Sequence, residues 1–306
     1  MKTITFFNEK GGVGKSTLTI MYASWLKYKH GVSVAVVDYN RRLEQYRRDE
    51  WSRRSELGLG ERISLDNAWP IITADTAAIR KLERDKISLS PNAFWFENLI
   101  RSGKCDGYDI LLLDFPGSYS EFSQLMVHNM ISLYCVVLDR DPQTARSTVQ
   151  VVKGFKDVGG RNALGIINQA QHFVSMKEYN NVKNVLENYG LPMLPDMVSY
   201  SERMKKISEP DIMRSSLEYP DWDAEAFAGS GDLGTENLFI DVTRELQKAA
   251  DFKGTATADL SFVETLTKKL EGQDKRQLTG TAFPQYEFPI EAFPASRRRQ
   301  MEALEK

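Results

Sequence analysis

The sequence predicts an α/β fold in which helices flank a doubly wound, mostly parallel sheet. Apolar, strand-like segments alternate with helical patterns from the N-terminus to about residue 200. Several of these segments are apolar throughout, which is typical of strands buried on both faces of a parallel sheet. A glycine-rich turn connects the first such segment to the first helical pattern. Alternation of this kind favours parallel strands joined by right-handed crossovers.

The elements follow in chain order. We expect strands at 2–7, 32–38, 108–117 (ending in a turn), 132–139, 163–169 and 191–198. We expect helices at 16–31 with Gly31 as its stop, at 41–57, 142–158 and 175–189, and at 235–250 with Thr235 as its cap.

The chain organisation is one large domain and an extension. Residues 1–250 form the domain, with an insertion at about 58–90 whose pattern is hard to interpret and a Gly-, Asp- and Ser-rich loop at 215–234. Residues 251–306 form a C-terminal extension, in which a helix at 259–270 precedes a Pro- and aromatic-rich tail. That tail has no period and is expected to be extended or disordered in part.

Composition excludes several classes of protein. The 306 residues are 42% hydrophobic and 27% charged, as in ordinary globular proteins. No apolar run reaches the roughly 20 residues of a membrane-spanning helix, and the N-terminus lacks a signal-peptide pattern. Two cysteines make no disulfide framework, so we expect a cytoplasmic protein without a membrane partner. The net charge of −2 gives no general attraction to nucleic acid.

The glycine-rich turn has the Walker A pattern. Its residues are Gly11, Gly12, Val13, Gly14, Lys15, Ser16 and Thr17, between a strand and a helix, the context that this motif requires. Backbone N–H groups of such a loop surround phosphate oxygens, and the helix N-terminus adds positive potential. Lys15 would contact the β- and γ-phosphates, and Ser16 would ligate Mg²⁺.

A second lysine precedes the glycines. The run from Lys10 to Ser16, Lys-Gly-Gly-Val-Gly-Lys-Ser, resembles the deviant Walker A motif of the ParA/MinD family of P-loop ATPases. The resemblance implies that the chain binds ATP and Mg²⁺ and forms an ATP-dependent homodimer, in which Lys10 reaches the partner's phosphates. It covers roughly residues 1–210 in motif order.

Two strand ends carry acidic residues of the same resemblance. Asp114 ends a strand similar to Walker B, and Pro116 and Gly117 follow it as the turn that senses the γ-phosphate. Asp38 matches the first aspartate of the family's Asp-x-Asp segment, but Asn40 stands at the second. Because asparagine cannot accept a proton at neutral pH, we expect slow hydrolysis, unless another carboxylate such as Glu44 replaces it. The implied catalytic residues are Lys10, Lys15, Asp38 and Asn40, and the implied Mg²⁺ ligands are Ser16, Asp38 and Asp114.

Later strand ends supply further candidates. We expect Asp139, Asp141 and Pro142 either to line the nucleotide or dimer crevice or to have a purely structural role. The resemblance implies that Asn168 contacts adenine and that residues 192–200 close over the base, although ordinary strand ends fit equally well. Cys105 and Cys135 are interpreted as structural, and the three histidines lack metal-ligand spacing.

Paired arginines mark a candidate nucleic-acid surface. They are Arg41, Arg42, Arg47, Arg48, Arg53 and Arg54. Such a patch can bind DNA phosphates without sequence preference, but interspersed acidic residues also fit a solvated helix with salt bridges. The basic segment at residues 296–306 does not resemble the membrane-targeting helix of MinD-type proteins.

Together these features predict a ParA-like dimerisation switch that binds and slowly hydrolyses Mg-ATP. Its process would be plasmid or chromosome partition, or a mobile-element function, with an unidentified partner protein. One alternative is a nucleotide-gated regulator with little or no hydrolysis. The other is an ATP-dependent small-molecule synthetase of the same fold.

Overall fold

The structure of the chain is a computed structural model. It describes residues 1–45, 69–86, 90–117, 130–139, 142–157, 162–168, 176–195, 198 and 234–249. All of them lie in the first of the two units into which the chain divides, residues 1–268 and 269–306. The elements expected at 46–57, 215–233 and 251–306 lie outside the described residues, so the predicted domain organisation stays a prediction.

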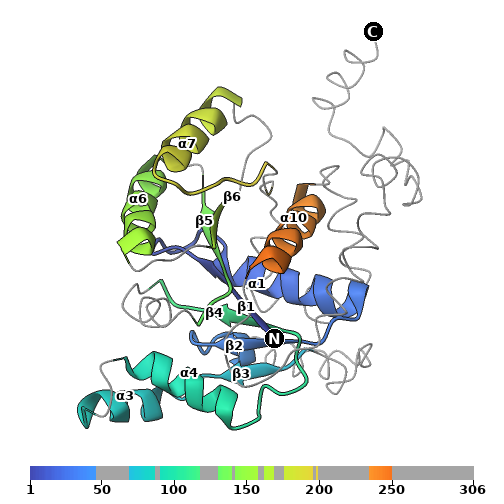
Figure 1. The fold of residues 1–306 in the computed structure, drawn as a ribbon, viewed down its shortest axis with the longest axis vertical. Coiled ribbons are helices and arrows are strands. Elements are labelled where there is room, and N and C mark those ends of the chain that lie inside the picture. Colours follow the sequence, from blue (N-terminus) through green and yellow to red (C-terminus); the bar gives the residue numbers. More distant parts are fainter. Residues whose placement is uncertain are drawn as a thin grey trace. The chain divides into compact units, whose positions relative to one another are not determined.

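Six parallel strands form the sheet of the described residues (Figure 1). Their order is β3-β2-β4-β1-β5-β6. The chain forms β2 and β3 on one side of β1, returns to place β4 next to β1, and then forms β5 and β6 on the other side. The predicted doubly wound parallel sheet is therefore confirmed. The strands are β1 (Lys2–Phe7), β2 (Val34–Asp38), β3 (Ile71–Thr73), β4 (Ile110–Asp114), β5 (Leu133–Leu138) and β6 (Ala163–Ile167).

Helices cover both faces of this sheet. They are α1 (Lys15–Ser24), its π-helical continuation η1 (Trp25–Lys29), α3 (Thr76–Arg84), α4 (Pro91–Arg101), α6 (Pro142–Asp157), α7 (Met176–Asn188) and α10 (Gly234–Lys248). On one face, side chains of β2, β4 and β5 share a core with Phe96 of α4 and Val152 of α6. On the other face, Tyr22 of α1 packs against Phe6 of β1 at 5.8 Å and Phe239 of α10 at 5.1 Å between ring centroids. The alternation of side chains along each strand supplies both cores.

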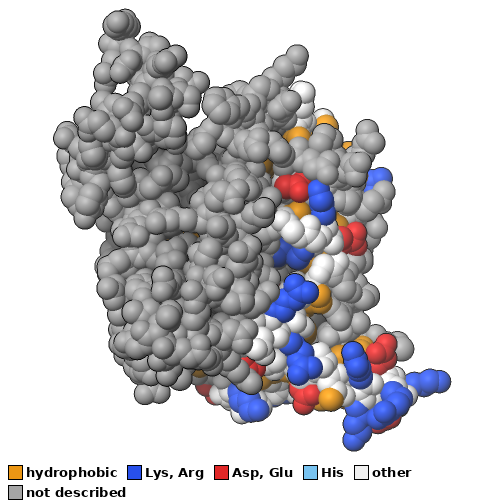
Figure 2. Space-filling view, turned by 180° about the vertical axis from the view of Figure 1, so that it is seen from behind, with side chains coloured by type: hydrophobic (Ala, Val, Ile, Leu, Met, Phe, Trp, Pro, Cys, Tyr) orange, Lys and Arg blue, Asp and Glu red, His pale blue; other side chains and the backbone are white. Residues whose placement is uncertain are grey.

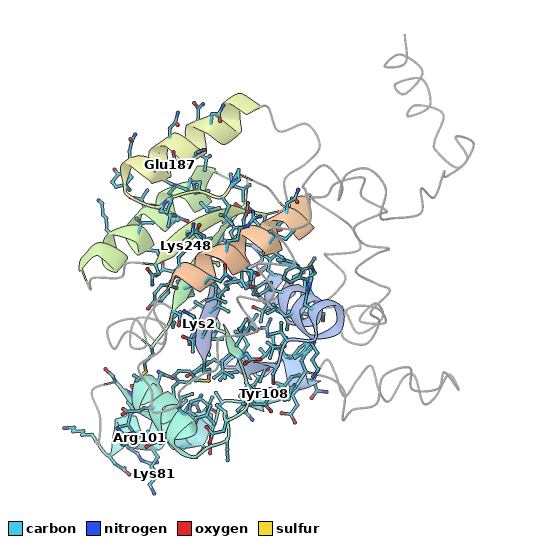
Figure 3. All side chains as sticks on the ribbon, turned by 45° about the vertical axis from the view of Figure 1, so that its right-hand side comes forward. Lys2, Lys81, Arg101, Tyr108, Glu187 and Lys248 are labelled. Carbon is cyan, nitrogen blue, oxygen red and sulfur yellow. The ribbon has the colours of Figure 1, made fainter. Side chains whose placement is uncertain are left out.

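A hydrogen bond from a buried lysine connects the start of β1 with the end of α10. Lys2 is only 3% exposed, and its Nζ donates a hydrogen bond to the Ala249 carbonyl directly after α10. Helix C-termini attract cations because their last carbonyls are unpaired. Figure 3 labels Lys2 on β1 and Lys248 at that end of α10. No helix of the described residues is both long enough and apolar enough to cross a bilayer.

Two expected elements differ in the structure. The strand expected at 191–198 is wrong: its described residues form one isolated bridge, between Met193 and Gly165. Pro192 and Pro195 flank this bridge, and proline has no N–H for a continuous ladder. The stretch expected as an insertion at 58–90 contains β3, which pairs with β2 from Val36–Ile71 to Asp38–Thr73 and so belongs to the sheet. Three residues are too few to show a strand period.

Helix ends follow the expected signals in one case and not in the other. Gly31 has a φ of 67°, and its N–H bonds to the Lys27 carbonyl, so the predicted glycine stop of the first helix is confirmed. The closing helix α10 begins at Gly234, one residue before Thr235, so Thr235 lies within the first turn rather than capping it.

Candidate functional site

The carboxyl ends of five strands bring the predicted site residues to one edge of the sheet. The glycine loop follows β1, Asp38 and Asp114 end β2 and β4, and Asp139 and Asn168 follow β5 and β6. Ligands of open α/β sheets bind at this edge, where the winding direction changes. In this sheet the change occurs at β1, which pairs with β4 on one side and β5 on the other.

The glycine loop has the backbone geometry of an anion site. Gly12 and Gly14 have φ values of 77° and 96°, which side chains other than glycine rarely allow. A Cβ atom added to Gly11 or Gly12 would meet nothing within 4 Å, so this side of the loop is open. Gly14 precedes α1 directly, and the N–H groups of the helix start are therefore available to a phosphate.

Lys15 and Ser16 begin α1, and Thr17 lies partly buried beside them. Lys15 is 8% exposed, and its Nζ donates to the Lys10 carbonyl over 2.8 Å. Burial lowers the pKa of Lys15, while the charge of Asp114 opposes this shift. The Ser16 Oγ lies 2.9 Å from each carboxylate oxygen of Asp114.

Two carboxylates lie opposite each other at the ends of adjacent strands. Asp38 and Asp114 are paired residues of the β2–β4 register, and both side chains are fully buried. The Asp38 oxygens accept the backbone N–H groups of Arg41 and Leu43, both over 2.8 Å. This folds the chain after β2 into a tight turn, with Arg41 at a φ of 59°. The turn brings Asn40 Nδ2 within 3.2 Å of Asp114 Oδ2.

This burial of two acids shifts their pKa values upward. Burial, then the charge of Asp38, raises the pKa of Asp114 to about 7, and Asn40, Ser16 and Lys15 oppose the shift. Burial also raises the pKa of Asp38, against backbone hydrogen bonds from the turn. Both shifts favour the neutral form of these carboxyl groups in the free protein. A bound cation would favour their ionised form instead.

The donor set fits Mg²⁺. This ion prefers oxygen ligands and keeps several waters, and the Ser16 hydroxyl and the Asp114 carboxylate provide adjacent oxygens. Among the described residues, no cluster of three or more His, Cys, Asp or Glu side chains could hold a metal. The remaining ligands of an ion here would be water and phosphate oxygens.

Lys10 is held by its own chain. Its Nζ lies 2.8 Å from Asp139 Oδ2 and 2.8 Å from Thr144 Oγ1, and the Thr144 hydroxyl also donates to Asp139. The buried Asn8 fixes the start of the loop, because its Oδ1 accepts the Lys10 N–H over 3.0 Å and its Nδ2 donates to the Val137 carbonyl over 2.8 Å.

Neither Asn8 nor Thr144 was identified from the sequence. The sequence feature that could have identified Asn8 is its amide side chain, placed directly after an apolar strand and before the glycines. The feature for Thr144 is weaker, because a hydroxyl in the first turn of a helix is common.

Two more predicted residues contact the loop. Asn168 is 5% exposed, and its Nδ2 donates to the Val13 carbonyl over 2.7 Å, so it supports the loop. The predicted adenine contact of Asn168 remains a prediction. A Cβ added to Gly117 would lie 2.6 Å from the Glu9 carbonyl oxygen. Only glycine therefore allows the turn after β4 to touch the start of the loop.

The side chains of the other candidates make different contacts, or these candidates lie outside the described residues. Glu44 accepts a hydrogen bond from Thr73 over 2.6 Å. Arg41 and Arg42 are exposed, and Arg41 donates to Thr76. Cys105 and Cys135 are buried and their pKa values are raised by burial, which fits a structural role. Asp141 and the other four paired arginines, Arg47, Arg48, Arg53 and Arg54, lie outside the described residues.

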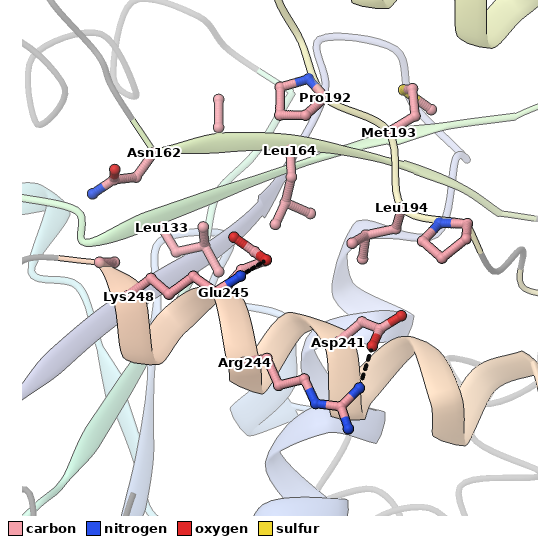
Figure 4. Close-up of a pocket in the computed structure, with 13 residues that line it drawn as sticks. Leu133, Asn162, Leu164, Pro192, Met193, Leu194, Asp241, Arg244, Glu245 and Lys248 are labelled. Atoms are coloured by element: carbon pink, nitrogen blue, oxygen red, sulfur yellow. Dashed lines mark hydrogen bonds and ion pairs between the residues drawn. The ribbon is translucent and has the colours of Figure 1, made fainter. Parts of the chain in front are cut away.

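A separate hollow of about 520 Å³ lies at the amino ends of β5 and β6, beside α10 (Figure 4). Leu133, Leu164 and Leu194 contribute apolar walls. Its charged side chains pair along α10, Asp241 with Arg244 at 3.0 Å and Glu245 with Lys248 at 2.7 Å. The hollow therefore lies at the amino ends of the strands, whereas the glycine loop lies at their carboxyl ends.

Comparisons with known proteins bear on this geometry. The family model of the ATPase MipZ matches residues 2–138, a little under half of the chain. The structure resembles a complex of a McdA variant from Cyanothece with ATP, at 16% identity and a TM-score of 0.53, over 81% of this chain and 96% of that one. The predicted resemblance to ParA/MinD-like P-loop ATPases is confirmed.

Two further structures share the fold. The septum site-determining protein MinD from Pyrococcus horikoshii, complexed with Mg-ADP, is 18% identical with a TM-score of 0.50, over 79% of this chain and 95% of that one. Cobyrinic acid a,c-diamide synthase from Mycobacterium smegmatis, with bound ADP and magnesium, is 16% identical with a TM-score of 0.50, over 75% of this chain and 95% of that one. No curated protein matches the chain.

The raised pKa of Asp114 predicts how stability depends on pH. A carboxyl whose pKa rises on folding, here from 3.8 to about 7, contributes stability below the unfolded value that is lost as pH rises through the folded value. Asparagine does not ionise, so Asp114→Asn should melt several degrees above wild type at pH 8 without Mg²⁺ or nucleotide. The difference in melting temperature between the two proteins should disappear toward pH 4. The corresponding difference in free energy of unfolding at pH 8 has an upper bound of about 4 kcal/mol. A gap that is equal at every pH, measured by calorimetry, would contradict this origin.

Proposed function

We propose that the chain binds Mg-ATP through residues 11–17 and hydrolyses it slowly, acting as an ATP-dependent dimerisation switch. The observation that carries the proposal is the convergence of Ser16 and Asp114, 2.9 Å apart, beside an open glycine loop. Hydroxyl, carboxylate and loop N–H groups then all face the place of a terminal phosphate.

Each residue has a distinct role in this proposal. The loop N–H groups bind phosphate oxygens, and Lys15 leaves the Lys10 carbonyl to contact the terminal phosphates. Ser16 and Asp114 hold Mg²⁺, which when bound neutralises charge on the phosphates. Asp38 keeps the turn after β2 in place through hydrogen bonds from backbone N–H groups, among them those of Arg41 and Leu43, and orients Asn40. Asn40 positions the attacking water through its side-chain oxygen.

Removal of the loop cation tests nucleotide binding. Lys15→Ala should weaken Mg-ATP binding at least 100-fold, because Lys15 is the one cation that the loop directs at phosphates bound to its own chain in this proposal. Fluorescent ATP titration measures the effect. Lys81→Ala on α3 is the matched control, since Lys81 is exposed and far along the chain from the loop. Equal affinity in wild type and Lys15→Ala would refute the assignment.

The Lys10 contacts predict how dimerisation is controlled. For Lys10 to reach a partner's phosphates it must leave Asp139 and Thr144. Lys10→Ala should therefore keep nucleotide binding and lose the ATP-dependent dimer. Asp139→Asn should lower the ATP concentration needed for dimerisation about 3- to 10-fold, because a partly exposed charged pair contributes about 1 kcal/mol.

Sedimentation velocity with ATP separates the outcomes for Lys10. The control is Asp241→Asn on α10, which removes the ion pair with Arg244. It should dimerise as wild type does. A wild-type chain that stays monomeric at saturating ATP would contradict the dimer proposal while leaving ATP binding intact.

Asn40 predicts the speed of hydrolysis. A positioned general base contributes about 10²- to 10⁴-fold to a rate, and asparagine provides none. Asn40→Asp should raise single-turnover hydrolysis at least tenfold at saturating Mg²⁺, with little change in ATP affinity. It should also destabilise the free protein, since it replaces the hydrogen bond to Asp114 by like charge. Equal rates in the two proteins would mean that another residue handles the water.

Partition or a related positioning process is the proposed biological role, with an unidentified partner protein. DNA is a candidate partner through the paired arginines. Figure 2 shows Lys and Arg side chains gathered over α3 and α4, where Arg80, Lys81 and Arg84 are exposed. Salt-dependent DNA binding would support both surfaces. The alternatives remain a regulator without hydrolysis and a small-molecule synthetase, whose fold the Mycobacterium smegmatis enzyme shares. Turnover assays with and without DNA, together with a measurement of molecular size with ATP, distinguish them.

A further inference from the structure

An aromatic group connects the segments that follow the two buried carboxylates. Tyr39 follows Asp38, and Phe115 follows Asp114. Their rings stack with centroids 4.5 Å apart and planes 21° from parallel. Trp95 of α4 meets the Tyr39 ring edge-on, at 5.5 Å and 76°. We call Tyr39, Phe115 and Trp95 the aromatic clasp.

The clasp lies on the opposite side of the strands from the carboxylates. Tyr39 and Phe115 belong to the core that α4 shares with the sheet, and they are 7% and 0% exposed. Since successive side chains alternate across a strand, each aromatic ring shares a backbone with a carboxylate that points the other way. The Tyr39 N–H also bonds to the Asp114 carbonyl over 2.9 Å, which extends the β2–β4 ladder by one residue.

When both carboxyl groups are ionised, like charge at these paired positions favours separation of the strand ends, and the clasp opposes it. Offset aromatic stacking stabilises a pair beyond the area that it buries. The turn from Asp38 to Leu43 and the turn at Gly117 both continue from this point. A displacement of the backbone that carries either ring would therefore also move one carboxyl group and one turn.

We infer that Tyr39 is a positioning residue that, stacked on Phe115 and braced by Trp95, holds Asp38 and Asp114 in register for Mg²⁺. This inference rests on the proposed Mg-ATP site. It assigns a role to aromatic side chains that do not themselves contact the phosphates.

The first measurement uses the free protein. In Tyr39→Leu, amide hydrogen exchange of Arg41 and Leu43 should accelerate about 3- to 10-fold, because their hydrogen bonds to Asp38 open more often. Tyr39→Phe keeps the ring and should exchange as wild type. Phe239→Leu, a fully buried aromatic of α10, is the control that loses core packing without affecting these amides. Unchanged exchange at Arg41 and Leu43 in Tyr39→Leu would overturn the inference.

The second measurement separates the clasp from the nucleotide site. The Mg²⁺ concentration for half-maximal nucleotide binding should rise about 3- to 10-fold in Tyr39→Leu, while Mg²⁺-free nucleotide affinity stays unchanged. Tyr39→Phe should restore the wild-type value, and Phe239→Leu should not shift it. An equal loss with and without Mg²⁺ overturns the positioning role.

A wild-type chain that binds no nucleotide refutes the proposed function, whereas the exchange measurement still tests the clasp. If Tyr39→Leu does not fold, Phe115→Met takes its place, because methionine fills similar volume without a flat ring. The same exchange and Mg²⁺ expectations then apply to it.

Discussion

The burial of two carboxylates at paired positions is the constraint on which the rest of the site depends. Asp38 and Asp114 end neighbouring strands in register, and both are removed from water. Buried like charges are costly unless hydrogen bonds or cations compensate them. Backbone N–H groups surround Asp38, whereas Ser16, Asn40 and the nearby Lys15 compensate Asp114. The turn after β2 and the start of α1 are therefore placed by the same electrostatic requirement.

The glycine loop depends on a second set of contacts, and these come from the other half of the sheet. Asn8, directly after β1, donates to Val137 of β5, and Asn168, directly after β6, donates to Val13 of the loop. These two hydrogen bonds connect the loop to β5 and to the residue after β6, while the carboxylates lie at the ends of β2 and β4. A ligand that bridges the loop and Asp114 would connect the two halves across β1, which is where doubly wound sheets bind their ligands.

Much of this arrangement could be predicted from the sequence, because it follows from local patterns. Five strands and the glycine loop have unambiguous apolar runs or glycine spacing, and the carboxyl ends of parallel strands must meet at one edge. β3 could not be predicted, since three residues do not establish a period. The expected strand at 191–198 is not continuous in its described residues, which contact β6 at one isolated bridge, Met193 with Gly165, and at a separate hydrogen bond from the Val198 N–H to the Ile167 carbonyl. The clasp and the Lys10–Asp139 pair join residues 76 and 129 positions apart, and single-sequence patterns carry no such information.

Asn40 is best understood from the charge of the site rather than from the absence of a base. In the free protein its amide donates to Asp114, within hydrogen-bond distance of a carboxylate whose pKa is already raised. An aspartate at position 40 would add a third acid to two that are fully buried, and the same Lys15 would have to compensate all three. Asparagine instead supplies a hydrogen-bond donor and lowers the electrostatic cost of the two buried carboxyl groups. The feature that slows hydrolysis in our proposal is then the one that stabilises the nucleotide-free state. In our proposal such a chain would favour a long-lived nucleotide-free state and a long-lived ATP-bound state over rapid turnover.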